Sequence, residues 1–79
     1  MKVIVRVYGT LRKRFPDYQE GQGVEIHVPN DATTQDLLDR LKIPESLGPV
    51  VAMEGRIIKP DDNIIQGEDI RIFQTIHGG

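Results

Sequence analysis

The residues whose type and position suggest chemistry are the two glycines that end the sequence, Gly78 and Gly79. A free α-carboxyl group is almost fully ionised near neutral pH, so it is a competent though weak nucleophile. Because glycine has no side chain and a permissive backbone, such an end can carry its carboxyl carbon into a narrow cleft of another protein. We therefore expect a terminal carboxylate that a partner activates with ATP and Mg²⁺. The alternative is a frayed end without function.

Side chains elsewhere in the sequence offer little catalytic chemistry. The chain has no cysteine, which excludes disulfides, thiolate metal sites and a nucleophilic thiol. It contains neither a Ser/His/Asp arrangement nor a glycine loop that could cradle phosphate, which argues against an autonomous enzyme. His77 lacks a second ligand at suitable spacing and is interpreted as a solvated tail residue. We expect the chain itself to bind no metal and no cofactor.

Two charged clusters could indicate calcium binding or RNA binding. Four acids that precede the last predicted strand lack the ligand spacing of a calcium loop, so they are interpreted as turn residues. These acids are Asp61, Asp62, Glu68 and Asp69. Arg12, Lys13 and Arg14 precede Phe15, but three basic residues are too few to indicate RNA binding in a chain of net charge −2.

Composition limits the binding partners and the cellular location that we expect for the protein. Ten Lys and Arg against twelve Asp and Glu argue against nonspecific binding to nucleic acid or to an anionic membrane. No apolar run approaches the roughly 20 residues of a membrane helix. Met1 and Lys2 lead into an alternating strand pattern instead of a signal peptide. We expect a soluble cytoplasmic protein that binds neither nucleic acid nor membrane.

Hydrophobic periodicity shows which elements must position the terminus. Alternation predicts strands at residues 2–8, 24–28, 50–53, 57–58 and 70–76. Thr33 is the predicted N-cap of a helix with Asp36 at its third position, and leucines follow at helical spacing until Pro44. A lone helix can bury its leucines only by packing across one face of a mixed sheet. The expected fold is α+β: a ubiquitin-like β-grasp with four to five strands and one main helix.

Length sets the domain organisation. A chain of 79 residues is enough for one compact domain and too short for two. We expect residues 1–76 to form a single β-grasp domain and residues 77–79 to be a flexible tail ending in Gly-Gly.

Four stretches resemble the MoaD/ThiS family of sulfur carriers, and the resemblance runs over nearly the whole chain. They are the first strand leading into Tyr8-Gly9-Thr10-Leu11-Arg12, the Ala32-Thr33-Thr34 helix entry, the Gln66-Gly67-Glu68-Asp69-Ile70 turn and the final Gly78-Gly79. In that family the terminal carboxylate attacks ATP to give an acyl-adenylate, and a sulfur donor then displaces AMP to leave a thiocarboxylate. The resemblance implies that Gly79, next to Gly78, is the group that is adenylated.

Within the family, the extended segment from Leu11 to Gly23 is more similar to the small subunit of molybdopterin synthase than to the shorter thiamin-pathway carrier. This resemblance implies molybdenum-cofactor synthesis with three partners: an E1-like adenylyltransferase, a sulfur donor protein and a large synthase subunit whose active site the tail completes. Residues 74–77 depart from the pattern, because many such subunits have prolines there. Carriers for thiamin, cysteine, tungsten cofactor or tRNA thiolation remain alternatives, as does a ubiquitin-like protein modifier or interaction domain.

The sheet face opposite the helix is the predicted docking surface. If the valines of the first strand and Ile70 and Ile72 point inward, alternation brings a mixed set of side chains to the other face. That set is Ile4, Arg6, Tyr8, Arg71 and Phe73. Aromatic and arginine clusters are typical interface anchors, and the resemblance implies partner contacts at Tyr8 and Phe73. Arg12 and His77 complete the predicted partner-binding residues. The alternative is that Phe73 belongs to a small secondary core under residues 9–23.

Overall fold

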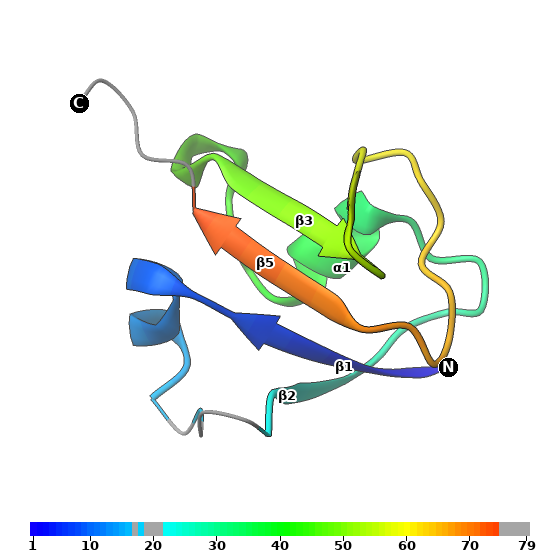
Figure 1. The fold of residues 1–79 in the computed structure, drawn as a ribbon, viewed down its shortest axis with the longest axis horizontal. Helices are drawn as coiled ribbons and strands as arrows, with labels where there is room; N and C mark the ends of the chain where they lie inside the picture. Colours follow the sequence, from blue (N-terminus) through cyan, green and yellow to red (C-terminus); the bar gives the residue numbers. More distant parts are fainter. Residues whose placement is uncertain (17, 19–21, 75–79) are drawn as a thin grey trace.

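A mixed five-stranded sheet with one α-helix against one of its faces makes up most of the fold (Figure 1). The computed structural model describes residues 1–16, 18 and 22–74. The strands are β1 (Lys2–Val7), β2 (Val24–His27), β3 (Pro49–Met53), β4 (Arg56–Ile58) and β5 (Ile70–Gln74). Their order across the sheet is β2-β1-β5-β3-β4. This is the ubiquitin-like β-grasp arrangement, so the predicted fold is confirmed.

The first and last described strands lie side by side in the middle of this sheet. β1 pairs with β5 in parallel, with Arg6 opposite Arg71, while the pairs β1–β2, β3–β4 and β3–β5 are antiparallel. The register brings the ends of β1 and β5 together, because the backbone N–H of Tyr8 donates to the carbonyl of Ile72 at 3.1 Å. Residues near both ends of the sequence therefore meet at one place on the surface.

Side-chain alternation gives the sheet one dry face. Val3, Val5 and Val7 of β1 are at most 2% exposed, and Ile70 and Ile72 of β5 are completely buried. The helix α1 (Thr34–Arg40) covers them with buried Leu37 and Leu38, and buried Leu41 follows directly at its end. Removing this apolar surface from water is the main favourable term in folding. The predicted inward face is confirmed.

The helix begins at the predicted cap. The Thr33 hydroxyl accepts from the backbone N–H of Asp36 at 3.2 Å, and the Asp36 carboxylate accepts from the backbone N–H of Thr33 at 2.9 Å. This reciprocal capping box satisfies two helix N–H groups that would otherwise lack partners. At the other end, the N–H of Ile43 donates to the carbonyl of Leu38, and Lys42 lies between them at a φ of 59°.

Hydrophobic periodicity does not predict two short 3₁₀ helices, η1 (Gly9–Arg14) and η2 (Glu45–Leu47). The first lies in the long connection between β1 and β2. Several element ends also move by one residue: Tyr8 and Val28 fall just outside their strands, and Pro49 begins β3. Ile76, the predicted end of the last strand, and the predicted tail of residues 77–79 lie outside the described residues. Within the described part of the chain, no helix is long and apolar enough to cross a membrane.

Candidate functional site

The face of the sheet that α1 leaves uncovered carries the predicted docking residues. Arg6 of β1 and Arg71 of β5 are neighbours across the parallel pair, and Ala52 of β3 follows in the same row. The next row holds Tyr8, Phe73 and Val50. We call this surface the open face; its members are Ile4, Arg6, Tyr8, Val50, Ala52, Ile57, Arg71 and Phe73. An apolar surface that includes aromatic and arginine residues is typical of a binding site.

An aromatic pair marks one end of the open face. The rings of Tyr8 and Phe73 are stacked with their centroids 4.8 Å apart and their planes inclined by 10°. Phe73 nevertheless remains 39% exposed, so the described part of the segment between β1 and β2 does not cover it. This exposure fits a docking residue better than a member of a secondary core. Gln74, the last described residue, follows directly and accepts a hydrogen bond from the Thr10 hydroxyl of η1.

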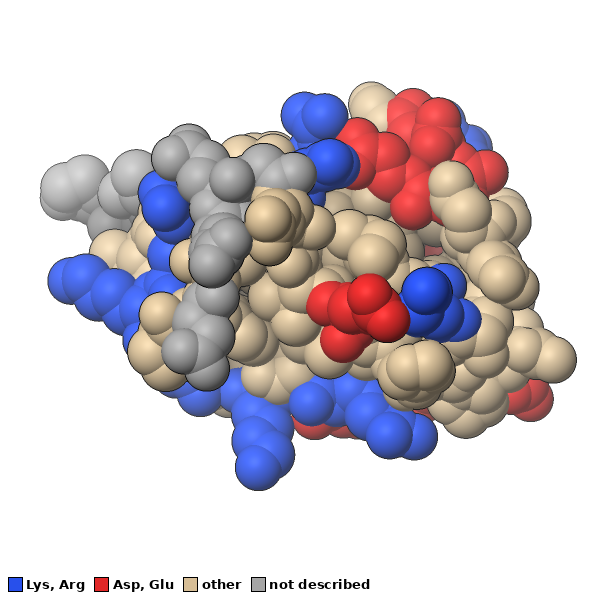
Figure 2. All heavy atoms as spheres, turned by 90° about the horizontal axis from the view of Figure 1, so that it is seen from below, with Lys and Arg blue, Asp and Glu red and all other residues tan. Residues whose placement is uncertain are grey.

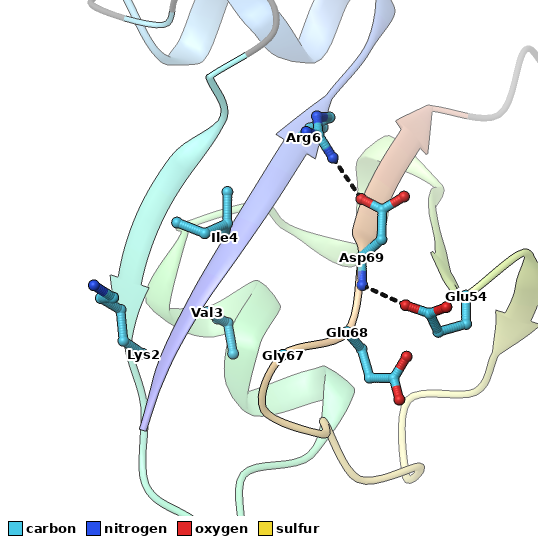
Figure 3. Close-up of a pocket in the computed structure, with 8 residues that line it drawn as sticks. All are labelled: Lys2, Val3, Ile4, Arg6, Glu54, Gly67, Glu68 and Asp69. Atoms are coloured by element: carbon cyan, nitrogen blue, oxygen red, sulfur yellow. Dashed lines mark hydrogen bonds and ion pairs between the residues drawn. The ribbon is translucent and has the colours of Figure 1, made fainter.

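The two arginines of the open face share one carboxylate, that of Asp69. The Arg6 guanidinium lies 2.6 Å from Asp69 Oδ1, and Arg71 Nε lies 2.9 Å from Asp69 Oδ2. Asp69 is itself held by Glu54, whose carboxylate accepts from the Asp69 backbone N–H at 2.9 Å (Figure 3). Each guanidinium has five N–H donors, so both arginines keep donors for a partner while one nitrogen of each is held by Asp69.

Interpreting Asp69 only as a turn residue misses this role. Asp69, Arg71 and Phe73 are separated by two positions each, so strand alternation already places them on one face. The carboxylate two residues before a strand arginine was therefore a usable signal. Its partner Arg6 could not be assigned without knowing that β1 and β5 are adjacent and parallel.

A shallow hollow lies on the open face at the end away from the aromatic pair. Its volume is about 300 Å³, and it lies between the start of β1 and the turn before β5. Lys2, Ile4 and Arg6 line it on the β1 side, with Glu54 and Asp69 opposite (Figure 3). Charges of both signs meet here, so the hollow is suited to polar contacts at the rim of an interface.

The structure brings four of the predicted partner-binding residues together on the open face: Arg6, Tyr8, Arg71 and Phe73. Arg12 is not among them, because it lies in η1 with its guanidinium carbon 5.6 Å from the centre of the Tyr18 ring. His77, Gly78 and Gly79 lie outside the described residues. Among residues 1–16, 18 and 22–74, no group of three or more His, Asp or Glu side chains is placed to hold a metal ion.

Comparisons with known proteins support the fold and extend over the whole chain. No protein-family model matches the sequence, and no curated protein matches it. Among solved structures, SAMP1 from Haloferax volcanii superposes with a TM-score of 0.74 at 18% identity, covering 100% of both chains. A putative molybdopterin converting factor subunit 1 from Pyrococcus furiosus gives 0.71 at 21% identity, covering 95% of this chain and 98% of the other.

A third solved structure is a complex of subunits 1 and 2 of the molybdopterin-converting factor from Helicobacter pylori. Its matching chain gives a TM-score of 0.59 at 21% identity, with 100% of both chains covered. Identities this low show a shared fold and no more. The class that the structure defines is therefore the ubiquitin-like β-grasp domain, in the variety that these small proteins share.

Proposed function

We propose that this protein is a ubiquitin-like sulfur carrier of the MoaD/ThiS type, whose Gly79 carboxylate is adenylated and then converted to a thiocarboxylate. The observation that carries the proposal is the position of the aromatic pair. Tyr8 is half-buried and stacks on Phe73, which stays exposed one residue before Gln74 at the end of β5. A partner that docks on this pair therefore meets the segment leading to Gly79. The fold shared with the putative molybdopterin converting factor subunit 1 of Pyrococcus furiosus supports the same function.

In the proposed reaction this chain supplies the acyl group, and its partners supply ATP, Mg²⁺ and sulfur. The Gly79 carboxylate oxygen attacks the α-phosphorus of ATP, and pyrophosphate leaves. Hydrosulfide released by the donor then attacks the acyl carbon, and AMP leaves, so that the product is the thiocarboxylate. An E1-like adenylyltransferase supplies the ATP and Mg²⁺, and a sulfur donor protein supplies the sulfur. The open face orients the domain on these partners, which converts the attack into an effectively intramolecular step. The chain is thus a co-substrate, not an autonomous enzyme.

For the destination of the sulfur we propose molybdenum-cofactor synthesis. The Helicobacter pylori structure contains subunits 1 and 2 of a molybdopterin-converting factor together, and its matching chain is covered completely. By analogy, the tail of this protein would enter a large synthase subunit and complete its active site. Carriage of sulfur for thiamin, cysteine, tungsten cofactor or tRNA thiolation would use the same terminus and a different acceptor enzyme.

A protein modifier is the second candidate, and the comparisons give it a specific basis. A second Haloferax volcanii structure with a TM-score of 0.72 is described as small archaeal modifier protein 1. A modifier would use the same adenylate but pass the acyl group to a lysine amine. The two functions therefore differ in the atom that displaces AMP.

Intact-mass spectrometry tests the proposal. The chain is incubated with the E1-like enzyme of its own organism, Mg-ATP and a sulfur donor, and a gain of about 16 Da is expected, because sulfur replaces oxygen at the activated carboxyl group. Deletion of Gly79 provides the control and abolishes the gain. An isopeptide bond between Gly79 and lysine would instead support the modifier. No gain, with an enzyme that charges another carrier in the same assay, would overturn the proposal.

A further inference from the structure

The edge strand β2 leaves backbone groups available for a further strand. Met1 and Val28 exchange two hydrogen bonds, of 2.6 and 2.8 Å. In an antiparallel pair such bonded positions alternate, so Ile26 and Val24 also bond inward to β1. The N–H and C=O groups of Glu25 and His27 therefore point away from the sheet, and in the described part of the chain no strand pairs with them.

An apolar groove runs along the helix side of this edge. Val24 and Ile26 are only half-buried, because the helix does not extend over the outermost strand. Phe15 and Leu41 supply the remaining apolar lining, from the end of η1 and the end of α1. The groove has a volume of about 640 Å³ and is open to solvent. Side chains from a strand added to β2 would point into it at every second position.

Four cations surround the groove: Lys13, Arg14, Arg40 and Lys42. No acid is present among its described lining residues, and these four side chains form no ion pair within the described part of the chain. Figure 2, viewed from the side on which β2 lies, shows Lys and Arg gathered at the left and along the lower rim, with the largest group of acids at the upper right and a smaller one beside a cation near the middle. This positive charge is local, since the whole chain carries a net charge of −2.

One hydrogen bond and one unusual backbone conformation lie among these cations. Arg14 Nη2 donates to the carbonyl of Lys42 at 2.8 Å, which joins the end of η1 to the end of α1. Lys42 has a φ of 59°, the left-handed conformation that usually ends a helix on glycine. A lysine accepts backbone strain there that glycine would avoid. Strain of this kind is concentrated at functional sites, and Lys42 is one of the residues that line the groove.

We propose that this groove binds an extended acidic segment of a partner protein, which adds to the sheet as a strand beside β2. Its backbone would bond Glu25 and His27, its apolar side chains would enter the groove, and its carboxylates would meet the four cations. Nucleic acid fits less well, because a phosphodiester backbone has no donor for the outward C=O groups of β2 and no apolar side chain for the floor of the groove. The groove lies on the helix side of the sheet, so it stays accessible when a partner covers the open face, and it does not depend on sulfur carriage.

NMR spectra of the ¹⁵N-labelled full chain test the proposal with a defined probe. The probe is a short synthetic peptide of alternating valine and threonine followed by a run of glutamates; a second peptide carries lysines in their place. We expect only the acidic peptide to bind, and to slow hydrogen exchange of the Glu25 and His27 amides. The double variant R40E/K42E should bind it at least ~10-fold more weakly. The control variant R56E/K59E changes the net charge by the same amount, but its residues lie in β4 and directly after it, away from the groove. It should bind the acidic peptide normally.

A second pair of variants separates strand addition from simple charge attraction. His27→Pro removes an outward N–H group, whereas His27→Ala retains it, and proline is tolerated at the exposed edge of a sheet. Peptide binding is expected to be lost in the proline variant alone. Equal binding of the acidic and basic peptides, no binding of either, shifts confined to the open face, or an oligouridine that binds the groove more tightly than the peptide would each overturn the proposal.

Discussion

At the scale of single residues, Asp69 is the organising group of the open face. Arg6 and Arg71 are directly opposite each other in the β1–β5 pair, a position in which like charges repel. The Asp69 carboxylate lies between them and contacts both, and its backbone is held by Glu54. The shared carboxylate offsets the repulsion between the two guanidinium groups and holds them side by side as hydrogen-bond donors. Asp69 thus contributes by fixing the arginines that a partner would meet.

Replacing Asp69 with Asn should therefore destabilise the domain modestly. The change keeps the shape of the side chain and removes the charge shared by Arg6 and Arg71, which are about one-third and one-half exposed. We expect the free energy of unfolding to fall by about 1 kcal/mol at low salt. Because exposed charges are screened, the loss should shrink in about 1 M sodium chloride. Urea denaturation at both salt concentrations measures it.

The double variant D69N/R71Q is the matched comparison for this prediction. The cost of D69N is measured as the difference in the free energy of unfolding between R71Q and D69N/R71Q. With Arg71 already removed, the repulsion that Asp69 offsets is reduced, so D69N should cost less in this background than it does alone. A loss that is the same at both salt concentrations and in both backgrounds would show that the charge of Asp69 does not hold the row together.

Strand alternation was enough to assign most of the open face from the sequence. Arg6, Tyr8, Arg71 and Phe73 could be placed together because the residues that alternate with them in β1 and β5 are the apolar ones that face the helix. Period-two alternation therefore assigns these four residues to the opposite face. Arg12 could not be placed this way, since it belongs to η1, where neither a strand nor an α-helical period applies. Long-range pairing decided the rest: local patterns do not reveal that β1 is parallel to β5.

At the scale of elements, η1 is a packed part of the core and not a loose connection. Its Leu11 is 1% exposed and joins the same apolar cluster as the valines of β1. The element was missed because six residues with one buried leucine give no periodicity. The N-cap Thr33, with Asp36 at the third helical position, was by contrast predicted correctly because it depends only on residues three positions apart; the structure adds the reciprocal hydrogen bonds between them.

Truncating Leu11 tests how firmly η1 is anchored. Leu11→Ala leaves a cavity beneath the 3₁₀ helix and should lower the free energy of unfolding by about 2–4 kcal/mol. The exposed neighbour Lys13 provides a control, and Lys13→Ala should change it by less than ~0.5 kcal/mol. Thermal and urea denaturation followed by circular dichroism give both values. A loss below about 1 kcal/mol for Leu11→Ala would mean that η1 can detach without disturbing the core.

At the scale of the whole molecule, the sheet separates two surfaces. The open face carries Tyr8 and Phe73, and the helix side carries the cationic groove along β2. Because a thin layer of buried side chains lies between them, the domain can contact two proteins at once. Phe73 provides the test of the first surface, since its ring is exposed and its removal leaves the dry face intact.

Phe73→Ser should leave the domain folded and weaken the complex that we propose it forms with an E1-like enzyme. We expect a loss of affinity of at least ~10-fold, because an aromatic anchor at an interface centre typically contributes 2 kcal/mol or more. Ile65→Ser is the matched control, since Ile65 is also a large exposed apolar residue but lies in the connection before β5. Calorimetric titration measures both. Normal binding by a folded Phe73→Ser variant would assign Phe73 to packing alone.

The central position of β5 also determines when the domain can assemble during synthesis. β5 is the last described strand to be translated, yet it lies between β1 and β3 and joins the two halves of the sheet. Before it leaves the ribosome, only the hairpins β1–β2 and β3–β4 can form, and an isolated two-stranded hairpin is marginal in water. The nascent chain therefore stays unfolded until residues 70–74 have emerged, so an enzyme that recognises the assembled open face cannot engage a half-made copy.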